Sequence, residues 1–442
     1  MKAPGDLGWI DDFWARAGKR IFAREEDGVL ILPPNRVYKA NSTAAALVLY
    51  LKGGGKAAGL KLPSAEAAVE VASFFGDLAA LYRAEAPANG TVGAVPFGFD
   101  FTSLPVLAEI ALTYRCNNAC RFCYAGCGSS RPADGPSCGG VSAATMKRPE
   151  ADTASFLRIV DLFADEARVP FFSFTGGEPL LREDLELLAR RAGKRGIATN
   201  LVTNGTLADR PRARSLRRAG LGSAQVSVEA NDALLHDSLV GRRGAFGETL
   251  AGIAALKSAG IPTQTNTTLT RENLAIAAEM PAFLASLGIE RFAMNLFIPT
   301  VAGERSEALF VAYEEIGAVV DAVAREARSR GLVFHWYSPT PFCSYNPIAR
   351  GLGNKSCAAA DGLLSVAPDG SVLPCSSWDE PIGNLLKSSF RSIWFSETAA
   401  FYKRKLFAGG ECRDCASFTA CQGACPLYWR FVGPAKDSRR AV

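Results

Sequence analysis

Between Val106 and about Arg330 the chain alternates strand-like apolar runs with helical stretches rich in Ala and Leu. The strand-like runs are FFSFTGG, ATNLVTNG, SAQVSVEA, PTQTNTTLT and RFAMNLFIP. Repeated β-α units of this kind predict an α/β fold with a parallel sheet. Parallel β-α sheets bind ligands at the carboxyl ends of their strands, so we expect the chemistry there.

A smaller unit precedes this region. Residues 20–39 contain two or three short β-rich runs broken by Gly and Pro turns. Next, Ser42 or Thr43 is expected to cap an apolar helix, and a second amphipathic helix is expected over about 64–85. The Pro, Gly and Phe-rich stretch 86–105 has the composition of a packed linker.

The pattern changes again after His335, where segments rich in Gly, Pro, Ser and Cys replace long periodic helices. Seven of the 12 cysteines lie between Cys343 and Cys425, which predicts a unit held together by metal. A length of 442 residues fits about three domains. We expect them to span 1–95, 96–330 and 331–442.

Composition excludes several classes of protein. The net charge of +5 is too small over this length to indicate nucleic-acid binding, and the basic stretch 210–220 is typical of a solvated helix face. The N-terminus carries acids where a signal peptide needs an apolar core, and no run is long enough to span a bilayer. We therefore expect a cytoplasmic protein without membrane or nucleic-acid partners.

In a reducing compartment, 12 cysteines and only two histidines favour sulfur ligation of iron over disulfides. Cys116, Cys120 and Cys123 form a C-x3-C-x2-C triplet that directly follows an apolar run. Three thiolates can hold three corners of a 4Fe-4S cluster and leave the fourth iron open to bind and activate a small molecule. The alternative is a zinc site or buried thiols, but zinc needs a fourth protein ligand.

CNNACRFCY together with TGGEP, residues 175–179, resembles the radical S-adenosylmethionine (SAM) superfamily over roughly 106–330. The resemblance implies a partial (β/α)6 barrel in which SAM chelates the open iron. One electron from the cluster then cleaves SAM to methionine and a 5'-deoxyadenosyl radical, which abstracts a substrate hydrogen. A flavodoxin-like or ferredoxin-like donor is the implied external source of electrons.

The same resemblance implies a set of SAM contacts. Gly176 and Gly177 would let the backbone approach the methionyl part, and Glu178 would accept hydrogen bonds from its ammonium. The other implied contacts are Tyr124 with adenine, and Asn204, Ser227 and Arg242 with the ribose or carboxylate. For Asn204 and Ser227 the alternative is an ordinary turn residue at a strand end.

A second cysteine array resembles the SPASM extension, which carries auxiliary 4Fe-4S clusters in radical SAM enzymes that modify peptides and proteins. It consists of Cys357, Gly370 and Cys375, followed by Cys412, Cys415, Cys421 and Cys425 in C-x2-C-x5-C-x3-C. By that pattern Cys357, Cys375 and Cys425, with Cys343, would hold one cluster, and Cys412, Cys415 and Cys421 most of another.

The pattern usually supplies one more cysteine downstream, and this chain has none after Cys425. Asp437, an exogenous thiolate or a substrate group could fill that corner, or the cluster could be incomplete. Cys127 and Cys138 are either spare thiols or substrate contacts. His236 and His335 are expected to pack or bond locally, so no general base is assigned.

Residues 15–90 resemble the winged-helix peptide chaperone of pyrroloquinoline-quinone biosynthesis, the RiPP recognition element of ribosomally made, post-translationally modified peptides. The resemblance rests on EDGVLILPPNRVYKANSTAAALVLYLKGG. Such a domain adds a leader peptide as a strand to an exposed sheet edge. Alternatively, the unit packs on the barrel or binds another partner.

These expectations combine into a radical SAM/SPASM oxidoreductase that matures a precursor peptide, with an oxidative cross-link as the expected product. The auxiliary clusters would relay an electron or position the substrate. One alternative is a maturase of a small cofactor such as a porphyrin, and another is a maturase of a protein, like those of sulfatases or quinoproteins. A non-catalytic iron-sulfur carrier is a further alternative, although a carrier has no need of a SAM-binding segment.

Overall fold

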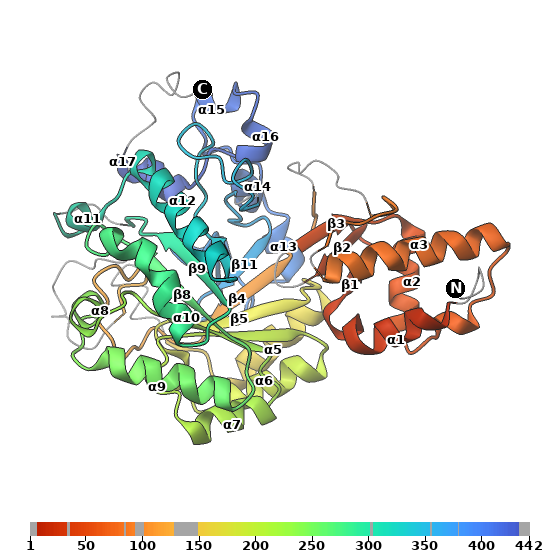
Figure 1. Ribbon diagram of the computed structural model, residues 1–442, viewed down its shortest axis with the longest axis horizontal. Helices are drawn as coiled ribbons and strands as arrows, with labels where there is room; N and C mark the ends of the chain where they lie inside the picture. The colour runs from red at the N-terminus through yellow and green to blue at the C-terminus, as the bar shows by residue number, and fades with distance from the viewer. Residues whose placement is uncertain are drawn as a thin grey trace. The chain divides into compact units, whose positions relative to one another are not determined.

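The computed structural model describes residues 7–32, 36–83, 85–92, 101–127, 149–300, 304–353, 356–378 and 380–432. The chain forms two compact units, which the red-to-blue colouring of Figure 1 helps to follow. The first unit comprises Met1–Leu107 with Arg168–Phe171, and the second comprises Ala108–Ala167 with Phe172–Val442.

The first unit contains a three-stranded antiparallel sheet in the order β1-β2-β3. Its elements are α1 (Gly8–Ala17), η1 (Gly18–Arg20), β1 (Phe22–Arg24), β2 (Val29–Leu32), β3 (Arg36–Lys39), α2 (Ser42–Lys52), η2 (Ala57–Gly59) and α3 (Ala65–Tyr82). The predicted strands and both predicted helices are confirmed, whereas α1 was not predicted. The cap of α2 is Asn41, whose side chain accepts from the Ala44 amide, and not Ser42 or Thr43.

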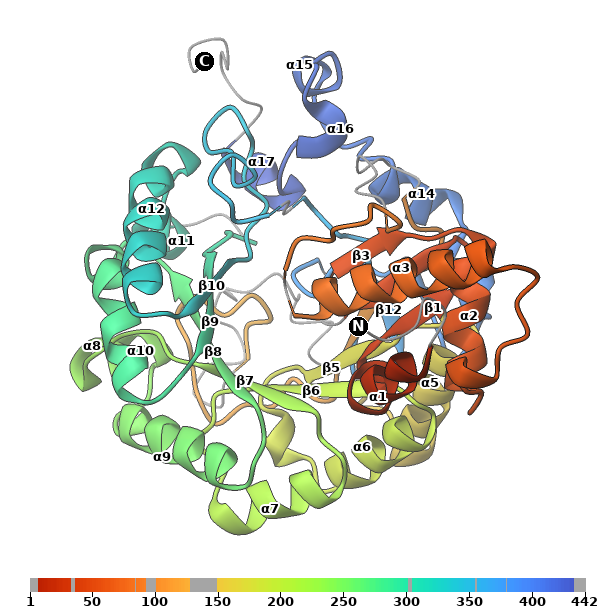
Figure 2. The same ribbon diagram turned by 45° about the vertical axis from the view of Figure 1, so that its right-hand side comes forward.

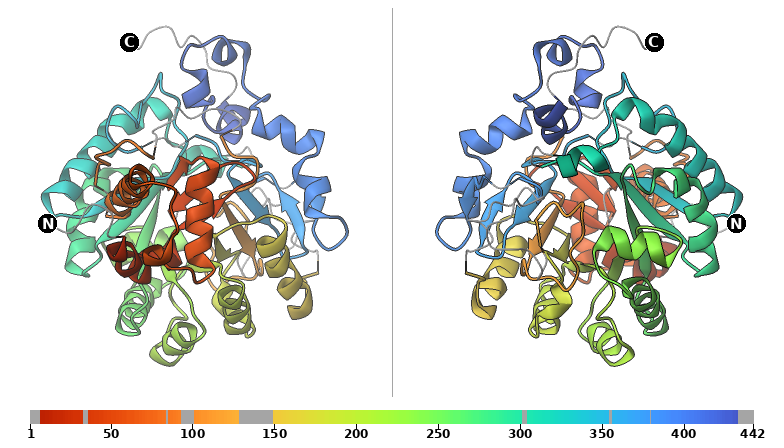
Figure 3. Two further views of the ribbon diagram at one scale, coloured as in Figure 1. Left: turned by 90° about the vertical axis from the view of Figure 1, so that its right-hand side faces the viewer. Right: turned by 90° about the vertical axis from the view of Figure 1, so that its left-hand side faces the viewer.

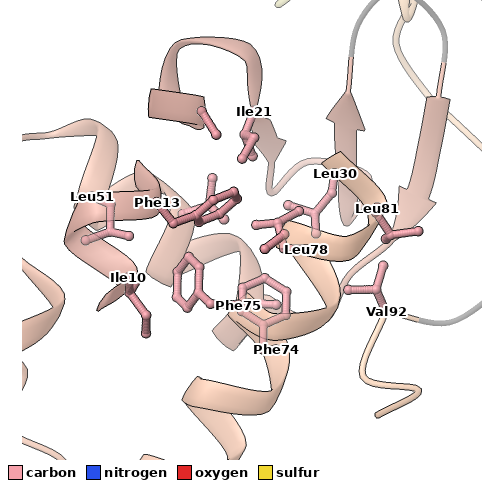
Figure 4. Close-up of a cluster of buried hydrophobic side chains, with 14 of the residues drawn as sticks. Ile10, Phe13, Ile21, Leu30, Leu51, Phe74, Phe75, Leu78, Leu81 and Val92 are labelled. Carbon is pink, nitrogen blue, oxygen red and sulfur yellow. The ribbon is translucent and has the colours of Figure 1, made fainter. Parts of the chain in front are cut away.

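Strand β2 is buried on both faces. Leu30 and Leu32 join the core that the helices form with Phe75 (Figure 4). Val29 and Ile31 point to the opposite face and pack against Val106. Because alternate residues of a strand face opposite sides, the unbroken apolar run of β2 is what a strand between two packed layers requires.

The second unit is built on a sheet in the order β10-β9-β8-β7-β6-β5-β4-β11-β12-β13. Its barrel strands are β4 (Leu107–Ala111), β5 (Phe171–Thr175), β6 (Ala198–Thr203), β7 (Ser223–Ser227), β8 (Thr263–Leu269), β9 (Arg291–Leu296) and β10 (Val333–Trp336). The strands pair in parallel, which confirms the predicted α/β barrel, and β10 continues it beside β9.

Helices cover the outer face of this curved sheet (Figure 2). They are α5 (Thr153–Asp165), η3 (Pro179–Leu181), α6 (Leu185–Lys194), α7 (Arg210–Arg218), α8 (Ala233–Val240), α9 (Ala245–Ser258), η4 (Leu274–Glu279), α10 (Met280–Ser286), α11 (Glu304–Leu309) and α12 (Tyr313–Ser329). The basic stretch forms α7, which buries only Ala213 and Leu216, as the solvated-helix prediction requires.

Polar side chains hydrogen-bond across the other face of the sheet. Asn200 Nδ2 donates to Ser173 Oγ over 3.2 Å, and Ser223 Oγ donates to Asn200 Oδ1 over 2.8 Å. Gln264 Nε2 donates to Gln225 Oε1 over 2.8 Å. The inner face of the barrel is therefore suited to a polar ligand.

The C-terminal segment continues the sheet beyond β4 with antiparallel strands, drawn in blue in Figure 3. It contains β11 (Leu363–Val366), β12 (Ser371–Leu373), β13 (Gly383–Asn384), α13 (Phe390–Trp394), α14 (Glu397–Lys403), α15 (Gly410–Arg413), α16 (Phe418–Cys421) and α17 (Pro426–Val432). Among the described helices of the chain, none is long and apolar enough to cross a membrane.

Candidate iron-sulfur and SAM site

The cysteine loop, residues 116–123, follows β4 at its carboxyl end. Cys116, Cys120 and Cys123 are all partly exposed. Burial raises the pKa of Cys116 to about 11 and also raises that of Cys120. Iron binds the thiolate form of cysteine, and its positive charge offsets the cost of burying that form. The loop can therefore supply three ligands to a bound cluster. The residues present thus fit a cluster with one open corner.

Helix α8 holds the middle of the cysteine loop. The Ala119 amide donates to the Val240 carbonyl and the Arg121 amide to the Leu239 carbonyl, each over 2.9 Å. Gly241, with φ of +66°, follows the helix, and a Cβ there would lie 2.5 Å from the Ala119 carbonyl oxygen. Only glycine therefore allows this approach.

The turn after β5 packs against the residues that lead into the cysteine loop. The Gly177 amide donates to the Thr113 carbonyl over 2.7 Å, and the Glu178 amide to the Arg115 carbonyl over 2.9 Å. A Cβ on Gly176 would lie 2.2 Å from the Thr113 oxygen, and one on Gly177 would lie 2.2 Å from the Arg115 oxygen. The glycines are thus required by the protein's own backbone, which the sequence argument did not foresee.

The Glu178 side chain is fully buried. It accepts from the Leu180 amide over 3.0 Å, from Thr203 Oγ1 over 2.7 Å and from the Asn204 amide over 2.8 Å. Burial raises the pKa of Glu178 to about 7 even though these bonds favour the charged form. The carboxylate expected to meet the SAM ammonium thus ties β5 to the turn after β6.

The Asn204 side chain reaches the cysteine loop. Its Nδ2 donates to Asn117 Oδ1 over 2.8 Å and lies 3.9 Å from Cys116 Sγ. Asn117 Nδ2 in turn donates to Thr206 Oγ1 over 2.8 Å. Asn204 is therefore more than a turn residue, since it fixes the start of the loop.

The Arg242 side chain also reaches the cysteine loop. Its Nε donates to Asn118 Oδ1 over 2.9 Å, and its guanidinium also pairs with Glu248. Asn118 is almost fully buried. Sequence reasoning missed Asn117 and Asn118, although two asparagines directly after the first cysteine of the triplet were the available signal.

Tyr124 and Ser227 lie on the inner side of the barrel. Tyr124 lines a small cavity of about 10 Å³ with Glu109 and Thr175, which is room for about one water. Ser227 ends β7 and pairs with Asn266 of β8. Their contacts with adenine and ribose remain predictions.

Two further groups lie beside the triplet. Cys127 is buried, and its thiol hydrogen-bonds to Cys123, which raises the pKa of Cys127. Glu229, also buried, acts electrostatically on Cys120, and burial raises its own pKa to about 8. Sequence reasoning did not single out Glu229. Cys138 lies outside the described residues.

The histidines pack as predicted. His236 is buried against Phe246, and its Nδ1 accepts from the Glu229 amide over 3.2 Å. Burial lowers the pKa of His236 to about 4, so the ring is neutral at pH 7. His335 stacks on Tyr337 in the β10 region.

Seven C-terminal cysteines fall into two sets. The inner set is Cys357, Cys375 and Cys425, and the outer set is Cys343, Cys412, Cys415 and Cys421. Burial raises the pKa values of Cys375, Cys412, Cys421 and Cys425, and cysteines of the same set add to each shift electrostatically. Cys343, which the sequence pattern grouped with the inner set, acts electrostatically on Cys412 and Cys421 of the outer set. The alternative ligand Asp437 lies outside the described residues.

Unsatisfied polar atoms beside these sets indicate that a group belongs there. Gln422 follows Cys421 and is fully buried, and neither atom of its amide has a partner among the described residues. Trp378 Nε1, three residues after Cys375, is likewise buried without a partner. Buried donors of this kind suit the sulfur atoms of a cluster. Among the described residues, no three Asp, Glu, Cys or His side chains lie close enough together to hold a single metal ion.

A buried lysine supports the inner set. Lys405 is fully buried, and its Nζ donates to the Cys357 carbonyl over 2.6 Å and pairs with Asp361 over 3.2 Å. The ammonium thus fixes the backbone at one cysteine of the set. No local sequence pattern indicated a role for this lysine.

Comparison with known proteins identifies the family. A model of the radical SAM superfamily matches residues 110–283, and a model of the SPASM iron-sulfur cluster-binding domain matches 357–416. A PqqA peptide cyclase of Ruegeria pomeroyi is 32% identical over 337 residues, which are 73% of this chain and 82% of that protein. The chain belongs to the radical SAM superfamily.

Other relatives differ in their named activity. An AdoMet-dependent heme synthase of Methanosarcina barkeri is 29% identical over 340 residues, which cover 73% of this radical SAM chain and 91% of the relative. The crystal structure of SuiB from Streptococcus suis matches with a TM-score of 0.65 at 17% identity, and covers 92% of this chain and 95% of that one. At that identity the likeness establishes the fold alone.

As a radical SAM enzyme with a SPASM domain, the protein uses a 4Fe-4S cluster with SAM, together with auxiliary iron-sulfur clusters. This confirms the predicted cofactors. That the cysteine loop holds the SAM-binding cluster, and that the C-terminal cysteines hold the auxiliary clusters, remain predictions.

Proposed function

We propose that this enzyme modifies a ribosomally made precursor peptide and recognises the peptide by its leader. When bound, the loop cluster supplies the electron that cleaves SAM to methionine and a 5'-deoxyadenosyl radical. The chain's own residues position that site: α8 and Asn204 contact the cysteine loop, and the β5 turn bonds the residues that lead into it. An oxidative cross-link is the proposed outcome.

The main support for a peptide substrate is the edge of the N-terminal sheet. Strand β3 lies at one end of the order β1-β2-β3 formed by the described residues. The Ala40 amide donates to the Gly28 carbonyl, and Leu30 pairs with Tyr38. Because hydrogen-bonded and non-hydrogen-bonded pairs alternate, Val37 and Lys39 direct their amides and carbonyls outward. An extended leader can pair with those groups.

The comparisons supply further support. Relatives named PqqA peptide cyclase match 73% of the chain, and SuiB has been solved bound to its precursor peptide SuiA. The match to SuiB covers 92% of this chain, so it extends into the N-terminal unit. A maturase of a small cofactor has no need of an edge that pairs with an extended peptide, so the edge favours the peptide proposal.

The test uses the full-length enzyme under anaerobic conditions with short peptides encoded beside its gene. We expect 5'-deoxyadenosine to form in step with the loss of two hydrogens from one peptide. Val37→Pro removes an outward amide donor without breaking the ladder, so we expect at least about tenfold weaker peptide binding and unchanged basal SAM cleavage. Val37→Ala, which keeps the amide, is the matched control and should bind normally.

The heme synthase relatives favour a second candidate, a porphyrin-like small molecule. That function predicts that a porphyrin changes in mass during SAM cleavage, whereas no peptide does. Turnover of a porphyrin that is insensitive to Val37→Pro would replace the peptide proposal.

A further inference from the structure

The loop that carries Cys343 contacts the outer set. The amide of Phe342 donates to Cys421 Sγ over 3.3 Å, which brings the residue before Cys343 against a member of that set. Cys343 also lies within electrostatic range of Cys412. The outer set is the more accessible one, since Cys343 and Cys415 are both exposed.

The backbone of the Cys343 loop is fixed by its own turn and by a contact with α12. The amides of Ser344 and Tyr345 both donate to the Pro341 carbonyl, over 3.0 and 2.9 Å, and close a tight turn around Cys343. Tyr345 Oη donates to Asp321 of α12 over 2.9 Å. The thiol is therefore held in place by the scaffold, and its exposure does not come from a loose loop.

The backbone between Cys421 and Cys425 separates the two sets. Gln422, Gly423 and Ala424 have φ values of +59°, +73° and +62°, so three consecutive residues are left-handed. In a helix, residues four apart would face the same side. The left-handed turn instead sends Cys421 to the outer set and Cys425 to the inner one, and non-glycine residues in that region persist only where the structure requires them.

We propose that Cys343 is the fourth thiolate of the outer auxiliary cluster, with Cys412, Cys415 and Cys421. Cys343 lies upstream of the other three ligands in the sequence. The assignment does not depend on the identity of the substrate.

The inner set is then left with Cys357, Cys375 and Cys425 among the described cysteines. The acidic side chains near it are engaged, because Asp361 pairs with Lys405 and Glu109 accepts from Ser365 Oγ over 2.6 Å. Among the described residues, one corner of the inner cluster then has no cysteine assigned to it.

Differential alkylation of the anaerobic, full-length holoenzyme tests the assignment, with reactivity measured at each cysteine by mass spectrometry. In the native holoenzyme we expect Cys343 to be protected from iodoacetamide as well as Cys415 is. In the Cys412→Ala/Cys415→Ala variant, which loses the outer cluster, Cys343 should become at least about tenfold more reactive while Cys357 stays protected.

The matched variant Cys357→Ala/Cys375→Ala removes the inner cluster and should leave Cys343 protected. The proposal is overturned if Cys343 is reactive in the native holoenzyme. It is also overturned if Cys343 becomes reactive when the inner cluster is lost and stays protected when the outer one is lost. Should either double variant fail to fold, Cys343→Ala serves instead. It should raise the reactivity of Cys415 and leave Cys357 unchanged, and the reverse pattern would refute the assignment.

Discussion

The cysteine loop and the C-terminal cysteine sets build metal sites in opposite ways. The loop places three cysteines within residues 116–123, and hydrogen bonds from α8 and from the side chains of Asn204 and Arg242 hold it against the barrel. The outer set combines Cys343 with cysteines that follow it by about seventy residues. A local site depends on close backbone packing around one loop, whereas a dispersed site depends on long-range contacts.

The two regions should therefore fail differently when altered. Changes around the cysteine loop should reduce SAM cleavage and leave the auxiliary clusters intact. Changes around the inner set should reduce overall stability first, because its supports are buried.

The largest effect is expected from Cys120→Ala. Removal of one of three thiolates should abolish reductive SAM cleavage, so that 5'-deoxyadenosine falls to the background measured without enzyme. Chromatography of the anaerobic reaction checks this. Cys127→Ala is the control, since the inferred ligands remain, and it should keep most of the activity. Normal cleavage by Cys120→Ala would contradict the assigned site.

Next in size is Lys405→Met in the auxiliary region. The change leaves Asp361 buried without its partner and should destabilise the protein by about 3–5 kcal/mol, as loss of one member of a buried pair does. Anaerobic denaturant unfolding checks this. The double variant Lys405→Met/Asp361→Leu removes both charges and should recover much of the loss. Equal stability of the single variant and the native protein would show that the pair does not support the inner set.

A smaller effect is expected from Gly177→Ala at the β5 turn. The added Cβ would lie 2.2 Å from the Arg115 oxygen, so the backbone must shift, at a cost of about 1–3 kcal/mol. We expect slower SAM cleavage and less iron in the loop cluster, measured by iron content and spectroscopy. Gly193→Ala in α6 meets nothing within 4 Å and should be neutral or slightly stabilising. Similar behaviour of the two variants would remove the argument for close packing.

The smallest effect is expected from Arg242→Ala. Loss of its hydrogen bond to Asn118 should cost about 1 kcal/mol and slow SAM cleavage several-fold. Arg271→Ala breaks a half-exposed pair with Glu315 and should change neither stability nor cleavage measurably. Steady-state rates for both variants separate a positioning residue from a surface ion pair.

Strands and helices were predictable because their signals are local. The alternation of strand-like and helical runs gave β5 to β9, and capping and turn residues gave α2 and α3. Helix α1 was missed, and the cap of α2 was placed one or two residues late, at Ser42 or Thr43 instead of Asn41. Neighbouring residues with similar capping propensity cannot be ranked without the path of the chain.

The sequence by itself determined the chemistry of the loop site, because the spacing of Cys116, Cys120 and Cys123 is a property of one short segment. Only the tertiary structure decided that the Cys343 loop contacts Cys421 and what Glu178 contacts. Those outcomes depend on which distant segments the barrel brings together and on a left-handed turn that no local pattern specifies. The spacing of cysteines in one loop determines which of them can share a cluster. Topology and packing determine which residues of distant loops come into contact.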